Sequence, residues 1–570
     1  MTALDRFGRA RHLRARVEHT GRAANHRNGE PIAAEDLPAF VLTALLLVLA
    51  CILGGSSRPG LAGDTLLQLA SLPVLWLALA RLRWASLAAP ARLALIWLGL
   101  VGALFALQCL PLPQGWWLAL GGRAEVAAEL VIAAVDPGAR PLSLDAYATE
   151  RALWTLLPPA AVFIGALSLD PRTRLRLVPV LFGIVSLSVV LGLAQVAGGP
   201  DSGLRLYAIT NPTEAVGFFA NRNHYAALLY MSLPLALAWL AARLAERSAG
   251  RAVSILGIVA DALLAMLVIL GLVLARSRAG LILGMAGLLA GVVIALSIAR
   301  IHHGGHARIT RGVVATAVIG LVLAIQYGLY GVLERLGQDP LGDARWTVLG
   351  VTLQAARHFG ALGSGFGTFV NAYQSFETPA VQFSAYVNHA HNDWAELWLE
   401  GGWPMAVLAA LLLAWLLFAG VRVWRQHVGS PMAAAIPRAA SVSIVLCLLQ
   451  ETVDYSLHTS ADLCVLALLC ALLVQRPAAG SLDEAKRNAA AIRAKPQCVS
   501  AQDSSESGMY AQSAWMPHAS IAAAAYTFVV ATCARFILRA RAGDTDGGCW
   551  VGSTEGYRGR SRRDFLQPFP

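Results

Sequence analysis

The stretch from Val253 to Ile298 reads V-S-I-L-G-I-V-A-D-A-L-L-A-M-L-V-I-L-G-L-V-L-A-R-S-R-A-G-L-I-L-G-M-A-G-L-L-A-G-V-V-I-A-L-S-I. It contains two apolar runs, 253–274 and 279–298, and each supplies the roughly 20 residues that an α-helix needs to cross a bilayer. Similar runs recur along the chain between short loops that carry arginine, glycine or proline. This pattern is typical of a helical bundle and not of a β-barrel. The sequence therefore predicts an all-α, polytopic transmembrane helical bundle.

The composition agrees with a membrane protein. Hydrophobic residues make up 57% of the 570 residues and charged residues only 14%. Long apolar stretches in such a chain indicate transmembrane helices, of which we expect about twelve. The expected spans are 38–54, 65–80, 92–110, 152–169, 177–197, 223–241, 253–274, 279–298, 313–333, 396–421, 436–453 and 461–475.

The chain divides into three parts. Residues 1–37 form a basic segment without the apolar core of a signal peptide, and we expect it to be cytoplasmic. Residues 38–476 form the transmembrane domain. The Ser/Ala/Arg/Gly-rich tail, 477–570, lacks apolar periodicity and is expected to be disordered and cytoplasmic. Within it, 519–538 is expected to form either an amphipathic interfacial helix or an additional membrane helix.

Arginine is distributed asymmetrically between the loops. Every second short loop is basic, and these loops carry Arg81, Arg83, Arg172, Arg174, Arg176, Arg243, Arg247, Arg251, Arg300, Arg308, Arg311, Arg422 and Arg425. The positive-inside rule assigns them to the cytoplasm. The other polar segments, 111–151, 198–222, 275–278 and 334–393, then lie outside. The net charge of +11 follows from this topology and does not indicate nucleic-acid binding.

Ionisable side chains gather in Y-V-N-H-A-H-N-D-W-A-E-L-W-L-E-G-G-W-P-M, the stretch that runs from Tyr386 to Met405. Asn392 or Asp393 is placed to cap a helix beginning near Trp394, and Glu396 would complete a capping box with Asp393. His391 then lies just outside a helix N-terminus. The partial positive charge there favours a neutral imidazole that can accept a proton.

Arginines on the outer side run against the topological bias and are therefore candidates for function. They are Arg222, Arg276, Arg278, Arg345 and Arg357. A guanidinium binds phosphate oxygens in a bidentate manner, so several arginines that converge near the outer face would hold a pyrophosphate. Alternatively, each of them anchors a helix at the lipid headgroups or pairs with a carboxylate such as Asp343.

Two other patterns carry less weight. His389 and His391 form an H-x-H pair that could bind a metal, but no further ligand cluster is evident and we expect no metal site. Gly363, Gly365 and Gly367 superficially resemble a nucleotide-binding loop. Because no strand precedes them, we interpret them as turn-forming glycines.

The segment H-N-D-W-A-E-L-W-L-E-G-G, from His391 to Gly402, resembles the histidine motif of the O-antigen ligase and polymerase superfamily: His, then Asn, Ser or Gln, nine residues and Gly. The segments G-F-F-A-N-R-N-H-Y-A, S-R-A-G, R-W and G-S-G-F-G-T-F precede it in the family's order, so the resemblance covers about 215–405. The ligase form continues G-x-x-G, whereas Trp403, Pro404 and Met405 follow here. Pro404 predicts a kink, and Met405 prevents close helix approach. Ligase and polymerase both stay open.

The resemblance implies a metal-independent, inverting membrane glycosyltransferase that needs no cofactor. Its donor would be a glycan on a polyprenyl diphosphate such as undecaprenyl diphosphate. Its acceptor would be lipid A core of lipopolysaccharide, a growing polysaccharide or a protein. The expected location is a bacterial inner membrane, with the active site on the periplasmic face of the cell envelope. A transporter for a small anion such as bicarbonate is the alternative.

By motif position, the resemblance assigns Arg278 and Arg345 to the donor's diphosphate, with Arg222 beside them. His391 would be the general base on the acceptor hydroxyl. Asn392, Asp393 and Gly402 would support it.

Overall fold

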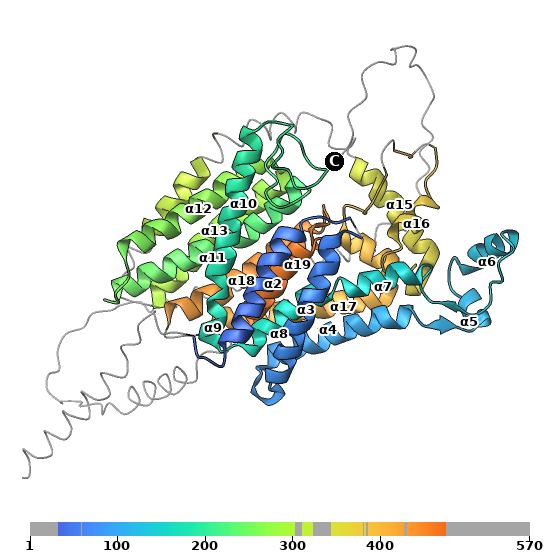
Figure 1. The fold of residues 1–570 in the computed structure, drawn as a ribbon, viewed down its shortest axis with the longest axis horizontal. Coiled ribbons are helices and arrows are strands. Elements are labelled where there is room, and N and C mark those ends of the chain that lie inside the picture. The colour runs from blue at the N-terminus through green and yellow to red at the C-terminus, as the bar shows by residue number, and fades with distance from the viewer. Residues whose placement is uncertain are drawn as a thin grey trace, which may run out of the picture.

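The computed structural model describes residues 32–58, 60–301, 311–322, 326, 344–379, 381–383, 386–426 and 430–474. Most of the basic N-terminal segment, the whole predicted tail with its 519–538 helix, and the first part of the predicted 334–393 loop, including Asp343, lie outside these residues. The described part is almost entirely helical (Figure 1). This confirms the prediction of an all-α polytopic membrane protein.

The elements follow one another along the chain in a simple order. They are α2 (Leu37–Leu53), α3 (Ala62–Arg81), η1 (Trp84–Ser86), α4 (Ala89–Gln108), β1 (Pro111–Leu112), α5 (Gln114–Leu118), α6 (Arg123–Ile132), β2 (Arg140–Pro141), α7 (Ala146–Trp154), α8 (Leu157–Ser168), α9 (Pro171–Leu175), α10 (Leu177–Ala197), α11 (Arg222–Ser248), α12 (Ile255–Ala275), α13 (Arg278–Ile301), a helix at Arg311–Val322, α15 (Ala344–Phe359), η3 (Gly360–Leu362), α16 (Phe369–Gln374), α17 (Asp393–Arg425), α18 (Pro431–Gln450), η4 (Ser456–His458) and α19 (Ser460–Leu473). β1 and β2 pair in an antiparallel manner.

Every predicted span overlaps an apolar helix in the described part of the chain. Nine stretches there are long and apolar enough to cross a membrane: α3, α4, α7 with α8, α9 with α10, α11, α12, α13, α17 and α18. Three predicted spans fall on shorter apolar helices, which are α2, Arg311–Val322 and α19.

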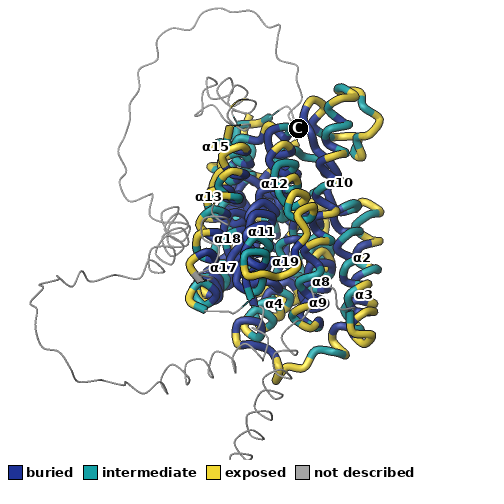
Figure 2. Tube along the Cα trace, turned by 90° about the vertical axis from the view of Figure 1, so that its left-hand side faces the viewer, coloured by how far each residue is buried: buried dark blue, intermediate teal, exposed yellow. Residues whose placement is uncertain are grey.

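Helix α11 is the centre of the bundle. Nearly all of it is buried, against α12, α13 and α18, and Figure 2 shows it in the colour of buried residues. Glycines allow the close contact: a Cβ on Gly280 would lie 2.5 Å from Ala226 Cβ, and one on Gly291 would lie 2.3 Å from Leu237 Cδ1. Small residues at helix interfaces are what membrane bundles use for tight packing.

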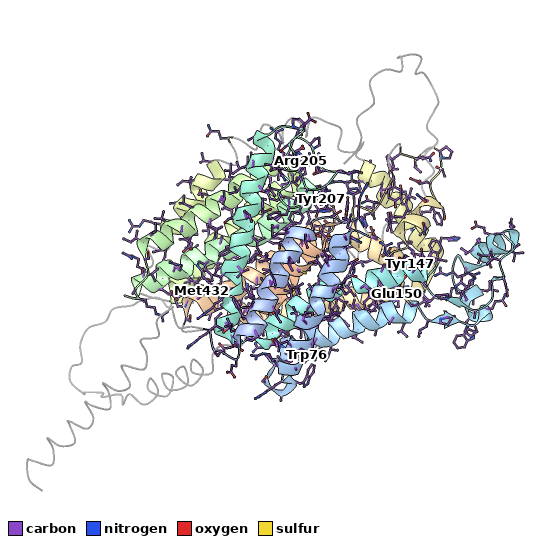
Figure 3. The ribbon with its side chains drawn as sticks, viewed as in Figure 1. Trp76, Tyr147, Glu150, Arg205, Tyr207 and Met432 are labelled. Carbon is purple, nitrogen blue, oxygen red and sulfur yellow. The ribbon has the colours of Figure 1, made fainter. Side chains whose placement is uncertain are left out.

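The periphery of the bundle is apolar and exposed. Only 22% of the membrane-length windows in α3 and α4 are buried, and Trp76 of α3 is 75% exposed (Figure 3). In a water-soluble protein such a surface would be a large unpartnered patch. Here it is the face that lipid covers.

The predicted outer segments contact one another. Arg123 Nη2 donates hydrogen bonds to the carbonyl oxygens of Leu142 (2.8 Å) and Gly363 (2.9 Å), which joins α6 to the segment before α17. The backbone N–H of Ala215 donates to the carbonyl oxygen of Leu274 (3.1 Å), beside the α12–α13 turn. In Figure 1, α5, α6, α15 and α16 accordingly lie at the same end of the molecule.

The predicted cytoplasmic loops meet at another end. Arg81 forms an ion pair with Asp36, and Arg174 donates to the carbonyl oxygens of Ala166 (2.7 Å) and Ala471 (3.3 Å). The polar segments thus sort to two ends of the bundle, as the arginine asymmetry predicts. Which end faces the cytoplasm stays a prediction.

Helix α17 is broken at Gly402, where φ is +53° and ψ −146°. We expected the kink at Pro404, so that prediction was wrong by two residues. Pro404 removes the N–H that would bond to the carbonyl of Glu400. That carbonyl accepts instead from the N–H of Gly365 (3.0 Å) and from Gln108 Nε2 (3.1 Å). A Cβ on Gly402 would lie 2.2 Å from Ala361 O, so only glycine fits this close contact.

The glycines of G-S-G-F-G are turn residues, as we interpreted them. Gly363, Gly365 and Gly367 have φ values of +75°, +113° and +77°. The N–H groups of Ser364 and Gly365 bond to the carbonyls of Leu399 and Glu400. The segment therefore fills the gap in the hydrogen bonding of the broken helix.

Candidate functional site

A cavity of ≈ 2280 Å³ opens between the bundle and the outer segments. Its lining includes His391, Asp393 and the three arginines selected from the sequence, Arg222, Arg278 and Arg345. Tyr147 and Tyr207, labelled in Figure 3, also line it. Arg276 and Arg357, which were also candidates from the sequence, are exposed and do not belong to the lining.

His391 has an unusual backbone conformation. Its φ is +52°, a left-handed value that few residues other than glycine adopt. Asn392 follows as the N-cap of α17, with Oδ1 accepting from the N–H of Ala395 (3.0 Å) and Nδ2 donating to Thr452 O (2.9 Å). The N–H of Asp393 donates to Glu451 O (2.9 Å). These bonds hold the segment that carries His391 against the loop between α18 and α19.

The predicted capping box does not form. Asn392 caps the helix, as one of the two predicted alternatives had it, but Glu396 does not bond back to the cap residue. Glu396 Oε2 accepts from the N–H of Ala390 (2.8 Å), and Oε1 lies 2.9 Å from His389 Nδ1. Glu396 lies one residue beyond the position where a capping-box side chain can reach the cap.

Asp454 is the partner of His391. His391 Nδ1 lies 3.6 Å from Asp454 Oδ1, just beyond hydrogen-bond length, and the Asp454 side chain is 1% exposed. Burial raises the pKa of Asp454. The adjacent His391 and the charges of His224 and Arg345 lower it by a larger amount, so this pKa lies well below its usual range. A carboxylate that stays ionised beside an imidazole orients the ring.

Tyr455 lies at the centre of the histidines. Its ring centroid is 4.6 Å from that of His389, 4.7 Å from His391 and 4.9 Å from His224. Burial and the charge of Asp454 raise the pKa of Tyr455 to about 12, so the phenol stays neutral. Tyr455 therefore separates the histidines as a fixed, uncharged spacer.

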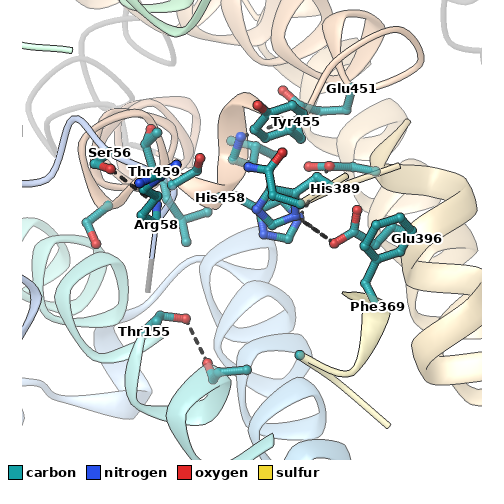
Figure 4. A pocket seen from close by; sticks show the side chains of 18 of the residues that line it. Ser56, Arg58, Thr155, Phe369, His389, Glu396, Glu451, Tyr455, His458 and Thr459 are labelled. Atoms are coloured by element: carbon teal, nitrogen blue, oxygen red, sulfur yellow. Dashed lines mark hydrogen bonds and ion pairs between the residues drawn. The ribbon is translucent and has the colours of Figure 1, made fainter. Parts of the chain in front are cut away.

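The two histidines of the H-x-H pair belong to different groups. His391 faces Asp454, whereas His389 lies with Glu396 and His458 (Figure 4). Nδ1 of His389, Nε2 of His458 and an oxygen of Glu396 all lie within 4.8 Å of one another. His389 and His391 therefore do not form an H-x-H metal pair with each other.

The arginines differ in their surroundings. Arg222 Nη1 forms an ion pair with Glu214, which is the pairing alternative that the sequence left open. Arg278 begins α13 and lines the cavity, and Arg345 lies close enough to Asp454 to lower its pKa. Two further arginines line the cavity, Arg58 and Arg151. Sequence reasoning missed these two arginines, although each lies on the predicted outer side of a membrane span.

Sequence reasoning also missed Asp454, Tyr455 and His458. They lie in E-T-V-D-Y-S-L-H, a polar turn between two apolar spans on the predicted outer side. That combination was the available signal for a functional site. Ionisable residues next to the hydrocarbon region are energetically costly, and those that are present commonly have a function.

The arrangement joins a histidine paired with an ionised carboxylate to arginines in one cavity. The O-antigen ligase family model matches residues 262–410, a range that includes Arg278, Arg345 and His391. No curated protein matches the chain. The family match supports a membrane glycosyltransferase of the ligase or polymerase type and does not favour anion transport. The chain is a multi-pass membrane protein whose residues 262–410 are similar to the O-antigen ligase family.

Proposed function

We propose that this protein transfers a glycan from a polyprenyl-diphosphate carrier to an acceptor hydroxyl, with His391 as general base. One observation carries the proposal: His391, whose Nδ1 faces Asp454, lines the same cavity as Arg222, Arg278 and Arg345. A base and a group of guanidiniums are the two components that displacement of a sugar from a diphosphate needs.

His391 accepts the proton at Nε2. Its Nδ1 faces Asp454, so the carboxylate favours the tautomer with the proton on Nδ1 and leaves the Nε2 lone pair free. The acceptor oxygen forms a bond to the anomeric carbon as the bond from that carbon to the diphosphate oxygen breaks. The hydroxyl proton passes to Nε2, and attack opposite the leaving group inverts the anomeric centre.

Arg278 and Arg345 stabilise the departing diphosphate, whose negative charge grows as the bond breaks. Arg222 has a supporting role, since Glu214 already engages one of its nitrogens. The proposed transfer relies on these guanidiniums to stabilise the leaving group and routes no step through a metal ion.

The cavity suits a large substrate. A volume of ≈ 2280 Å³ exceeds the 300–1,000 Å³ that is typical of small-molecule pockets. Its lining runs from apolar helix surface, including Trp97 and Leu98 of α4, to the polar outer loops. This fits a donor with a lipid tail and a glycan head. The proposed site is the periplasmic face of a bacterial inner membrane, with lipid A core, a lipid-linked glycan or a protein as acceptor.

A deletion strain tests the activity class. Loss of a surface glycan together with accumulation of its lipid-linked precursor, at unchanged bicarbonate uptake, is the expected result. Unchanged glycans with impaired anion uptake would contradict the proposal and favour a transporter.

A further inference from the structure

We propose that His389, Glu396 and His458, with Asp393 beside them, form a binding site for a divalent transition-metal ion of the zinc class. The site lies beside His391, and it is separate from the transfer step proposed above. The donor geometry, the orientation of the donors and a buried oxygen without a hydrogen-bond partner support this site.

The donor atoms have the spacing of a metal site. Oε1 of Glu396 lies 2.9 Å from His389 Nδ1 and 3.4 Å from His458 Nε2, and Asp393 Oδ1 lies 3.4 Å from His458 Nε2. Ligand atoms at about 2.0–2.1 Å from a tetrahedral zinc ion are about 3.3 Å apart. Two imidazole nitrogens with carboxylate oxygens form a set that zinc and its neighbours accept.

The buried oxygen without a hydrogen-bond partner is Oδ1 of Asp393. It accepts no hydrogen bond within the described part of the chain, although the side chain is only 8% exposed. An unsatisfied buried carboxylate oxygen is costly. This oxygen lies beside the three ligands, 3.4 Å from His458 Nε2.

The ligands are also oriented as metal ligands are. Oε2 of Glu396 accepts from the N–H of Ala390 (2.8 Å), which leaves Oε1 for the ion. The ring of His389 also lies near the backbone of Ser57. Metal-binding histidines commonly donate their second N–H to a nearby carbonyl.

In the metal-bound form, Nδ1 of His389 and Oε1 of Glu396, which lie 2.9 Å apart, would each coordinate the ion through a lone pair.

The ion would tie together the two loops that hold the reaction centre. His389 precedes α17, Glu396 and Asp393 belong to its first turns, and His458 lies in η4 after α18. The same two loops carry His391 and Asp454. A metal bond between them would fix the backbone around His391.

The test measures metal content directly. The full chain is purified in detergent through a tag that contains no histidine, stripped with a chelator, dialysed against Zn²⁺ and analysed by mass spectrometry. We expect about one zinc per wild-type chain, and at least tenfold weaker binding in His458→Gln and in Glu396→Gln, because even losing a supporting partner weakens sites 10- to 100-fold. His358→Gln, on α15, is the matched control and keeps the ion.

Wild-type protein loaded with Co²⁺ provides a measurement that does not depend on a variant folding. The expected result is the visible absorption of a tetrahedral site, displaced by equimolar Zn²⁺. Absence of both bound zinc and this absorption in the wild type would overturn the proposal, and so would equal zinc in wild type and His458→Gln. His391→Ala should keep its zinc, so failure of the metal site and failure of the proposed transfer reaction are distinguishable.

Discussion

Nδ1 of His391 lies 3.6 Å from Oδ1 of Asp454, although the whole of α17 and α18 separates the two residues in the chain. The two helices form a hairpin that returns the chain to the end from which it started. The loops before α17 and after α18 therefore meet, and their contact pairs a base with an ionised acid.

Asp454→Asn should lower transfer by about 100-fold or more while the protein stays in the membrane. A general base contributes a rate factor of roughly 10²–10⁴, and in this variant His391 loses the carboxylate that orients it. Initial rates with lipid-linked donor measure this. Near-normal rates would show that the contact has no part in the reaction.

The same variant should change the pH dependence of stability. The lowered pKa of Asp454 means that its charged form stabilises the fold above the ordinary aspartate pKa of about 3.9, and that this stabilisation is lost as pH falls through the lower folded value. Wild type should therefore melt at a higher temperature than Asp454→Asn at pH 7, and the difference should shrink below about pH 4. A difference that is constant with pH would argue for a packing effect.

Arg278→Ala and Arg345→Ala should each abolish transfer, and lysine at either position should restore little, because an ammonium cannot make a bidentate contact with phosphate. The structure offers matched controls. Arg276 lies in the same turn as Arg278, and Arg357 on the same helix as Arg345, yet both are exposed and outside the cavity lining. Arg276→Ala and Arg357→Ala should keep most activity. Equal losses in all four alanine variants would refute the diphosphate assignment.

Gly402→Ala should destabilise the protein by about 1–3 kcal/mol through backbone strain alone. The added Cβ also meets Ala361 O at 2.2 Å, so the cost should be at the upper end. Gly99→Ala in α4, where a Cβ meets nothing within 4 Å, is the control and should be neutral or stabilising. Thermal denaturation in detergent compares the two. Similar melting temperatures would show that the backbone at Ala361 moves to accommodate the added Cβ at little energetic cost.

The topology gives a further prediction. A periplasmic reporter fused after residue 360 should be active, and one at the N-terminus should not, because arginine is concentrated in the opposite loops. Activity of the 360 fusion only as a cytosolic reporter would invert the proposed orientation.

The sequence was sufficient for what depends on local pattern. Apolar length located the helices, the polar residues at the start of α17 narrowed its cap to Asn392 or Asp393, and the glycines at 363, 365 and 367 were correctly interpreted as turns. Each of these follows from the preferences of neighbouring residues.

The remainder depends on contacts between distant segments. Asp454 could be placed on the same side as His391 but not beside it, because the side-chain contact depends on how α17 and α18 pack. Similarly, Arg276 and Arg278 lie in the same turn, but only Arg278, at the start of α13, lines the cavity. The kink lies at Gly402 because the Ala361–Gly363 turn packs there, and the sequence around Pro404 does not encode that neighbour.

The most direct test of the proposed function is the rate of His391→Ala in membrane vesicles that contain lipid-linked donor and acceptor. Transfer should fall by about 10²–10⁴, with donor binding and protein level unchanged, whereas His358→Ala on α15 should stay near the wild-type rate. Transfer within a few-fold of wild type in His391→Ala would contradict the assignment of His391 as the general base.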